Sequence, residues 1–205
     1  RAIFICRPGG PEGPADDDEA PCARRILSRL ARLAYRRPVT EADVETLLEF
    51  FEQGRSEGAG FDAGVQLALE RLLVDPDFLL RVELDPANVA PAAVYALTDL
   101  EVASRLSFFL WSSLPDESLL AAAERRVLRD PVVLERQVRR MLADPRAASL
   151  VEDFGAQWLH LRNLSDVRGD PVPFPDFDDN LVEAFGTETE LFLTSTFRQD
   201  SSVLE

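Results

Sequence analysis

Two glutamates near the end of the chain are spaced so that they could act together as acid and base. Glu183 and Glu190 are seven residues apart, which places them on one face of the helix predicted here. Glycoside hydrolysis commonly uses a pair of carboxyl groups, one as general acid and the other as base or nucleophile. Seven helical residues span about 10 Å along the axis, at or beyond the separation used by inverting glycosidases. The sequence also shows no aromatic cluster suited to stacking on a sugar, so the pattern argues against catalysis by this pair.

Arg105 is the one charged residue within an apolar stretch over residues 102–111. A buried guanidinium without a partner is strongly destabilising. We therefore predict that Arg105 forms an ion pair with Glu188 or Glu190 of the last helix. If the chain were part of an enzyme, Arg105 and the carboxylates of this helix would line its pocket.

Aspartates at the start of the same helix could supply oxygen ligands to Ca²⁺. Asp176, Asp178 and Asp179 are the candidates. Their spacing departs from the EF-hand loop, which needs a Gly at its sixth position and a Glu at its twelfth. Carboxylates at a helix N-terminus also stabilise the helix without any metal. Capping is therefore the favoured interpretation, with calcium as the alternative.

The chain holds few soft metal ligands. Its single histidine, His160, could be an axial ligand of haem or of a metal, with Met141 as the second ligand. A lone His beside Trp158 is more often an ordinary surface residue. One His and two Cys cannot supply the four ligands of a structural zinc site, and the Cys-x-x-Cys-His pattern of c-type haem is absent. We expect no cofactor within this chain.

The two cysteines, Cys6 and Cys22, flank a segment rich in Gly, Pro and acidic residues. A disulfide between them would tie the N-terminal segment to the first helix. Two free buried thiols are the alternative, and spacing alone does not distinguish the two states.

Charge is distributed unevenly along the chain. The net charge is −15, and all 22 basic residues are Arg. Six of these lie within residues 22–37, which contain no acid, whereas residues 147–205 hold twelve acids against three Arg. The basic helices could bind an anionic ligand or pair with acidic helices of the same chain, and we favour the second interpretation. The negative net charge argues against nucleic acid as a partner, and no apolar run is long enough to span a membrane.

The elements that must position these residues are predicted to be helices. Thr40 and Asp43 fit a capping box, and Asp-Pro pairs at 75–76, 85–86, 130–131, 144–145 and 170–171 are typical helix starts. Apolar stripes that include residues 102, 106, 109 and 110, and residues 150, 154, 158 and 161, are expected to face inward. The predicted fold is all-α: about eight amphipathic helices in a compact bundle, with a short strand at Ile3-Phe4-Ile5 and an acidic Pro/Gly loop.

Several long motifs resemble two consecutive bacterial PSD-type domains of unknown function. The resemblance rests on Cys22-Ala-Arg-Arg-Ile-Leu, Leu33-Ala-Tyr-Arg-Arg-Pro-Val-Thr40 and Leu72-Leu-Val-Asp-Pro-Asp-Phe-Leu-Leu-Arg-Val-Glu83 for the first domain. For the second it rests on Leu97-Thr-Asp-Leu-Glu-Val-Ala-Ser-Arg-Leu-Ser-Phe-Phe-Leu-Trp111, Met141-Leu-Ala-Asp-Pro-Arg146 and Phe154-Gly-Ala-Gln-Trp-Leu159. We therefore expect a stub and acidic linker over 1–21, a first domain over 22–84 and a second, C-terminally truncated domain over 97–205.

Proteins with such domains come from planctomycetes and myxobacteria and accompany cytochrome c modules. The resemblance implies an extracytoplasmic protein, periplasmic or secreted and in some cases lipid-anchored. It favours the Cys6–Cys22 disulfide, and it places haem c in the full-length protein rather than in this chain. It supplies no catalytic residues, so enzyme activity is left open. We expect a non-catalytic helical module whose partners are neighbouring domains of the same chain. The alternative is part of a redox or polysaccharide-acting enzyme that uses Arg105 and the last helix.

Overall fold

The computed structural model describes residues 3–8, 19–81, 83, 90, 93–170, 172–199 and 202. The chain divides into two compact units, one formed by Arg1–Ser104 with Leu114–Val127 and the other by Arg105–Ser113 with Leu128–Glu205. Regular structure in the described residues is entirely helical, which confirms the all-α prediction. The helices are gathered into these two units and not into a single bundle.

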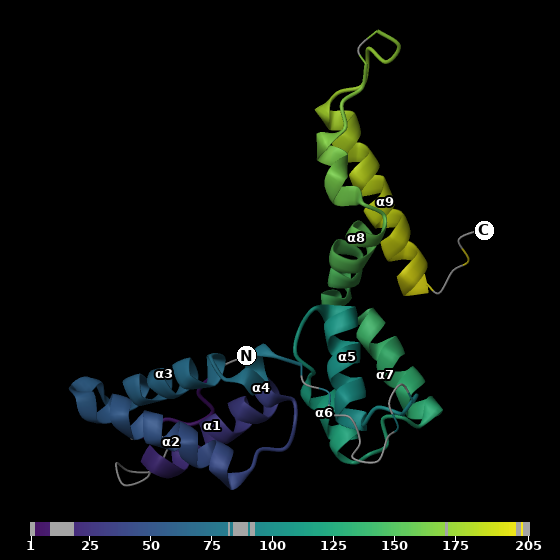
Figure 1. The fold of residues 1–205 in the computed structure, drawn as a ribbon. Helices are drawn as coiled ribbons and strands as arrows, with labels where there is room; N and C mark the ends of the chain where they lie inside the picture. The colour runs from purple at the N-terminus through teal and green to yellow at the C-terminus, as the bar shows by residue number, and fades with distance from the viewer. Residues whose placement is uncertain are drawn as a thin grey trace. The chain divides into compact units, whose positions relative to one another are not determined.

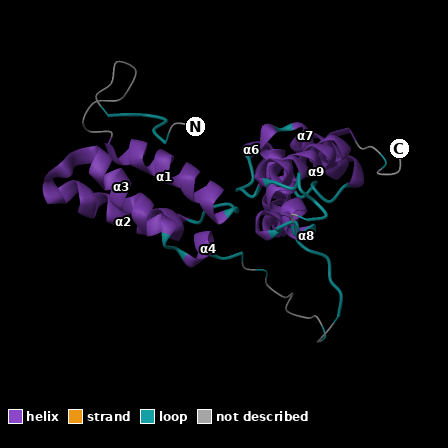
Figure 2. Ribbon diagram, turned by 90° about the horizontal axis from the view of Figure 1, so that it is seen from above, coloured by secondary structure: helices purple, strands orange, loops and turns teal. Residues whose placement is uncertain are grey.

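The first unit is built around three helices that lie side by side: α1 (Glu19–Tyr35), α2 (Glu41–Gly54) and α3 (Gly60–Leu73) (Figure 2). A π-helical turn, η2 (Arg55–Ala59), joins α2 to α3, and the short helices α4 (Pro76–Leu79) and α6 (Glu117–Glu124) complete the unit. Apolar side chains of α1, α2 and α3 form its core, with Ile26, Leu47 and Phe51 almost fully buried. The apolar stripes of these helices therefore face the core.

Gly64 allows α2 and α3 to approach closely. A Cβ atom at Gly64 would lie 2.7 Å from both the ring and the carbonyl oxygen of Phe51. Gly54 has the same role at the end of α2, where a Cβ would lie 2.7 Å from the carbonyl oxygen of Ala63. The two glycines therefore set the distance at which these helices pack.

The short strand predicted at residues 3–5 is wrong. Residues 3–8, as the structure describes them, adopt no strand, and a strand without a partner is unstable. Phe4 instead packs against the helical core, with its ring centroid 6.3 Å from that of Phe61. Arg7 forms an ion pair of 3.0 Å with Asp62 of α3. The segment is therefore held by side chains rather than by backbone pairing.

Helix starts follow the predicted caps. Thr40 and Asp43 form a complete capping box at α2. Asp75 caps α4, and Asp130 caps α7 with its carboxylate accepting from the backbone N–H of Val132 at 2.9 Å. Asp170 caps a turn rather than a helix. The Asp-Pro pair at 85–86 and most of the acidic loop lie outside the described residues.

The second unit contains the end of α5 (Asp99–Trp111), α7 (Pro131–Ala143) and α9 (Asp179–Gln199), with short helical turns between α7 and α9. These turns are η3 (Pro145–Ala147), the π-helical η4 (Leu150–Gly155), α8 (Ala156–Trp158) and the 3₁₀-helical η5 (Leu161–Asp166). Helix α9 runs alongside η4 and η5 (Figure 1). Among the described helices, none has both the length and the apolar character required to cross a membrane.

The inward stripes predicted for this unit are partly wrong. Leu110 and Leu150 are buried, but Phe109, Phe154 and Trp158 are 52%, 42% and 63% exposed. The prediction assumed 3.6 residues per turn, whereas the π-helical turn η4 closes its hydrogen bonds one residue later. The wider turn changes the direction of Phe154 within it and of Trp158 after it. Phe109 lies on α5, before this turn, and its exposure has no such explanation.

Candidate functional site

In the first unit, two of the motifs that carry the resemblance meet at Arg36. This residue follows the last residue of α1 and has a left-handed φ of 58°. Its buried guanidinium donates hydrogen bonds to the carbonyl oxygens of Ala34 at 2.9 Å, Asp77 at 2.5 Å, Phe78 at 3.2 Å and Leu80 at 2.7 Å. Carbonyls at the end of a helix lack partners within it, so Arg36 satisfies the end of α4. Burial lowers the pKa of Arg36, against the opposing effect of Asp77.

Arg37 connects the start of α2 to α4. Its guanidinium lies 2.7 Å from the carboxylate of Asp43 and 2.6 Å from that of Asp77. The hydrogen bond from Arg37, together with those from Thr40, lowers the pKa of Asp43 to about 2. We call Arg36, Arg37, Asp43 and Asp77 the arginine cluster.

Tyr35 and Asp75 extend the arginine cluster towards α3. Burial, followed by the negative charge of Asp75, raises the pKa of Tyr35 to about 12. Asp75 caps α4 and also pairs with Arg71 of α3 at 2.7 Å. These contacts hold the adjoining ends of α1, α2, α3 and α4 together. Their carboxylates and guanidinium groups face one another or backbone carbonyls, which is the geometry of a structural clamp.

Arg32 joins α1 to α6 within the same unit. Its guanidinium lies 2.6 Å from the carboxylate of Glu117 and 2.7 Å from that of Glu124. The contacts of Arg32 and Arg37 support the interpretation that the basic segment 22–37 is matched by acids of the same chain.

Trp111 is the centre of a comparable arrangement in the second unit. Its indole N–H donates to the carbonyl oxygen of Met141 at 2.9 Å, which satisfies the ring while it is buried. The guanidinium of Arg146 lies 3.5 Å from the ring centroid of Trp111. Asp144 holds Arg146 through two hydrogen bonds of 2.9 and 2.8 Å, and this contact lowers the pKa of Asp144 to about 2. Here, too, the motif residues contact one another.

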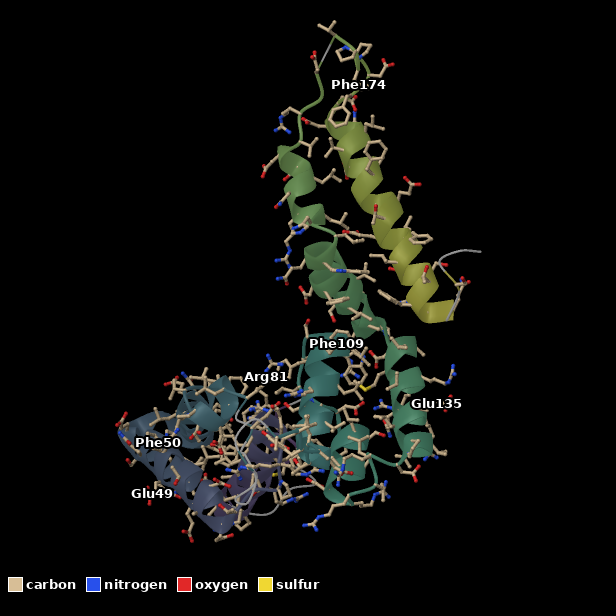
Figure 3. The ribbon with its side chains drawn as sticks, turned by 45° about the vertical axis from the view of Figure 1, so that its right-hand side comes forward. Glu49, Phe50, Arg81, Phe109, Glu135 and Phe174 are labelled. Atoms are coloured by element: carbon tan, nitrogen blue, oxygen red, sulfur yellow. A yellow bond between two sulfur atoms is a disulfide. The ribbon has the colours of Figure 1, made fainter. Side chains whose placement is uncertain are left out.

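An exposed aromatic row is the most distinctive surface feature of the second unit. Phe109 of α5 meets Phe154 of η4 edge to face, with ring centroids 5.4 Å apart, and Phe154 stacks on Trp158 at 5.8 Å. Figure 3 labels Phe109 at the start of this row. The apolar pattern of the sequence predicted all three residues to lie in the core, so their exposure was not expected.

A polar group flanks the aromatic row. Asp153, the neighbour of Phe154, accepts a hydrogen bond from the hydroxyl of Ser112. Its carboxylate also lies 3.7 Å from the guanidinium of Arg162. Both charged side chains are more than half exposed. The flank therefore offers donors and acceptors to solvent while its two formal charges cancel.

Glu183 and Glu190 line one shallow groove between η5 and α9. The groove has a volume of about 530 Å³ and an apolar floor formed by Leu161, Leu164 and Val182. Both glutamates are exposed to solvent, unlike acid–base groups held in a water-excluded site. Arg105 is not among the lining residues of this groove.

The other predicted site residues differ in their exposure to solvent. Arg105, Glu188 and Glu190 are exposed, so the desolvation argument for an ion pair does not apply, and that pair stays a prediction. His160 is exposed with a left-handed φ of 56°, whereas Met141 is fully buried. Only His160 of these two is therefore open to an incoming ligand.

Of the aspartates at the start of α9, Asp178 caps the helix. Asp178 accepts a hydrogen bond from the backbone N–H of Leu181 at 2.9 Å. Within the described residues, which include Asp176, Asp178 and Asp179, no three His, Cys, Asp or Glu side chains are grouped to hold a metal ion. The structure therefore gives the calcium alternative no support.

Cys6 and Cys22 are joined by a disulfide in the structure, with Cα atoms 5.9 Å apart. The bridge attaches the N-terminal segment to the first turn of α1, where Cys22 belongs to the core. Its position makes it a structural link, remote in sequence from the groove and from the aromatic row.

Comparisons with known proteins find two families. The model PSD5, described as "Protein of unknown function (DUF1595)", matches residues 22–83, and the model PSD4, described as "Protein of unknown function (DUF1592)", matches residues 97–205. No curated protein and no solved structure matches the chain. The resemblance to two consecutive PSD-type domains is thus confirmed. Because its match extends over more than half of the residues, the chain belongs to the DUF1592 family, with a DUF1595 domain preceding that region.

Proposed function

We propose that this chain is a non-catalytic helical module of a larger extracytoplasmic bacterial protein that carries cytochrome c modules, and that it positions neighbouring domains. The observation that carries the proposal is the arginine cluster. Arg36, Arg37 and Asp77 belong to the motifs of the first domain, and Asp43 lies just after one of them on α2. The described contacts of these charged side chains are with one another and with helix ends. Charge used in this way stabilises a scaffold rather than a reacting group.

The Cys6–Cys22 disulfide supports the extracytoplasmic part of the proposal. Disulfides persist in oxidising compartments and are rare in the cytosol. A bridge between a loop and a core helix stabilises the chain only where it stays oxidised. The periplasm and the exterior of a bacterium meet this condition.

The groove that Glu183 and Glu190 share is the observation that favours the second candidate, a polysaccharide-acting or redox enzyme. It brings two of the predicted carboxylates to one hollow, beside the guanidinium of Arg168. That guanidinium donates to the carbonyl oxygens of Ser165 at 2.6 Å and Val167 at 3.2 Å. The guanidinium of Arg168 is therefore bonded to nearby backbone carbonyls, and the two carboxylates are exposed to bulk solvent. We therefore favour the non-catalytic module over the enzyme hypothesis.

The compartment is tested by thiol labelling in the native bacterium. The full-length protein is treated in whole cells with a maleimide that adds mass, with and without prior reduction. We expect Cys6 and Cys22 to be protected until a reductant is added. Immediate labelling of both residues would contradict the extracytoplasmic placement, and a Cys6→Ser variant identifies the band that belongs to the pair.

The non-catalytic role is tested on the purified full-length protein, whose haem content is measured at the same time. The Glu183→Gln/Glu190→Gln variant should retain any redox or polysaccharide-cleaving activity of the full-length protein, and a protein without haem would contradict the cytochrome association. General acid–base catalysis contributes ~100-fold or more. A loss of that size in a correctly folded variant would favour the enzyme reading, and Glu188→Gln is the matched control on the same helix.

A further inference from the structure

We propose that Phe109, Phe154 and Trp158 form a binding platform for the sugar rings of a neutral polysaccharide. This inference goes beyond the proposed scaffold role and does not depend on it. A binding platform needs no catalytic group, so it also differs from the enzyme reading of the Glu183–Glu190 groove.

The aromatic row is exposed to solvent. Large aromatic side chains contribute most to stability when they are buried. Here three rings from three elements, α5, η4 and α8, form a contiguous row yet remain 52%, 42% and 63% exposed. The row is not a scatter of single surface residues, which would need no explanation. Contiguous exposed aromatic surface is typical of a binding site.

The stacking of Phe154 on Trp158 determines which ring face of Trp158 is open to a ligand. Phe154 and Trp158 stack with an interplanar angle of 18°, so one face of each ring is occupied by the other. Trp158 remains the most exposed ring of the row. An aromatic face carries a negative quadrupole, which favours the weakly positive C–H groups on the flat side of a pyranose ring. A sugar can therefore stack on the outer face of Trp158.

Ser112, Asp153 and Arg162 form a polar group beside the aromatic row. A ligand site combines apolar surface with a few polar groups that fix orientation. Asp153 and Arg162 present acceptors and donors close together, and their formal charges cancel. Such a pair suits hydroxyl groups better than it suits an ion. The net charge of −15 further disfavours phosphate-bearing or carboxylate-bearing ligands.

The test is affinity electrophoresis of the 205-residue chain in native gels that contain a dissolved polysaccharide. The probes are a mixed-linkage β-glucan and a galactomannan, both neutral, with polygalacturonate as the anionic comparison. We expect at least one neutral probe to retard the wild-type chain and polygalacturonate to leave it unaffected. Trp158→Ala should weaken that retardation about ten-fold, the upper range for one aromatic contact.

Phe174→Ala is the matched control. Phe174 is 61% exposed and lies outside the aromatic row, so its removal deletes a comparable exposed ring (Figure 3). In Trp158→Ala the remaining tryptophan is the buried Trp111, whose fluorescence reports whether the second unit is folded. An unchanged Trp111 signal shows that lost retardation comes from the lost ring.

Three results would overturn the proposal. The first is the absence of retardation by either neutral probe, and the second is equal loss in Trp158→Ala and Phe174→Ala. The third is self-association of the wild-type chain that Trp158→Ala abolishes, because the aromatic row would then be a contact between protein copies. None of these results bears on the scaffold role, which is tested through the disulfide and the full-length protein.

Discussion

At the residue scale, Arg36 tolerates two unfavourable conditions at once. A non-glycine residue in the left-handed region is strained by about 1–3 kcal/mol, and Arg36 has a φ of 58°. Its guanidinium is also withdrawn from solvent, with only 7% of the residue exposed. Its hydrogen bonds to carbonyl oxygens around α4 offset both conditions. A single side chain thus fixes where α1 ends and where α4 lies.

Replacing Arg36 with glycine separates these two effects. Arg36→Gly relieves the backbone strain but removes the donors to the carbonyls, so we expect it to lower the free energy of unfolding by more than about 2 kcal/mol. Arg126 also has a φ of 58° and is exposed. Arg126→Gly should therefore stay within about 1 kcal/mol of wild type. Urea unfolding followed by circular dichroism measures both, and equal effects would show that the guanidinium of Arg36 adds nothing.

The Arg37–Asp43 contact makes stability depend on pH in the acid range. The pKa of Asp43 falls from 3.8 to about 2 on folding, so the carboxylate stabilises the folded chain above pH 4. This contribution is lost as the pH falls from about 4 to 2, because the folded carboxylate then becomes protonated. Asp43→Asn lacks this contribution at every pH. Unfolding free energies measured at several pH values should therefore differ between wild type and variant at neutral pH and converge near pH 2; a constant difference would contradict the mechanism.

At the element scale, the sequence predicted helix starts better than helix faces. The caps at Thr40, Asp75 and Asp130 were correct, because a cap depends on a few neighbouring residues. The directions of Phe154 and Trp158 were wrong. Phe154 lies within the π-helical turn η4 and Trp158 follows it, and this turn is decided by packing that a local pattern does not contain. The aromatic row could be found only once α5 and η4 were placed together.

The strand prediction failed for a related reason. Ile3-Phe4-Ile5 has the composition of a strand, but strand formation needs a partner. The nearest surface is helical, so Phe4 packs against the core and Cys6 is bonded to α1.

The role of Arg36 as a clamp was not predicted either, because its carbonyl partners around α4 are more than 40 residues away in sequence. The Arg-Arg-Pro motif after a helix was the only local signal.

Gly64 offers a test of how closely α2 and α3 pack. An alanine Cβ at this position would lie 2.7 Å from the backbone oxygen of Phe51, which cannot move without shifting α2. We expect Gly64→Ala to lower the free energy of unfolding by about 1–3 kcal/mol. Gly186 of α9 has room, since its added Cβ would lie 3.8 Å from Leu164. Gly186→Ala should instead raise the free energy of unfolding by about 0.5–1 kcal/mol. Thermal unfolding of the two variants and the wild type measures both effects. A stabilised Gly64→Ala would refute the close approach.

At the scale of the whole molecule, the chain has a negative net charge and also contains ion pairs between its basic and acidic segments. The basic segment 22–37 is paired with acids on α2, α4 and α6. The acidic residues over 147–205 have few basic neighbours in sequence. The Arg-rich segment thus uses its charge to join helices of the first unit, whereas residues 147–205 carry an excess of acids that repels anions. This division agrees with a scaffold in the first domain and a neutral-ligand surface in the second.

The disulfide determines the conditions under which the whole chain reaches full stability. Cys6 and Cys22 are 16 residues apart, and closing a loop of this size restricts the unfolded chain by about 3 kcal/mol. Cys6→Ser/Cys22→Ser should therefore unfold at lower denaturant concentration than the oxidised wild type, and reduced wild type should match the variant. Arg7→Gln removes an exposed ion pair at the same segment and the contact of the guanidinium with the Phe4 ring, and it should cost less than about 2 kcal/mol. If oxidised and reduced wild type unfold together, the bridge does not stabilise the fold and the compartment argument loses its physical basis. If they differ as expected, the chain is at its most stable only where disulfides persist.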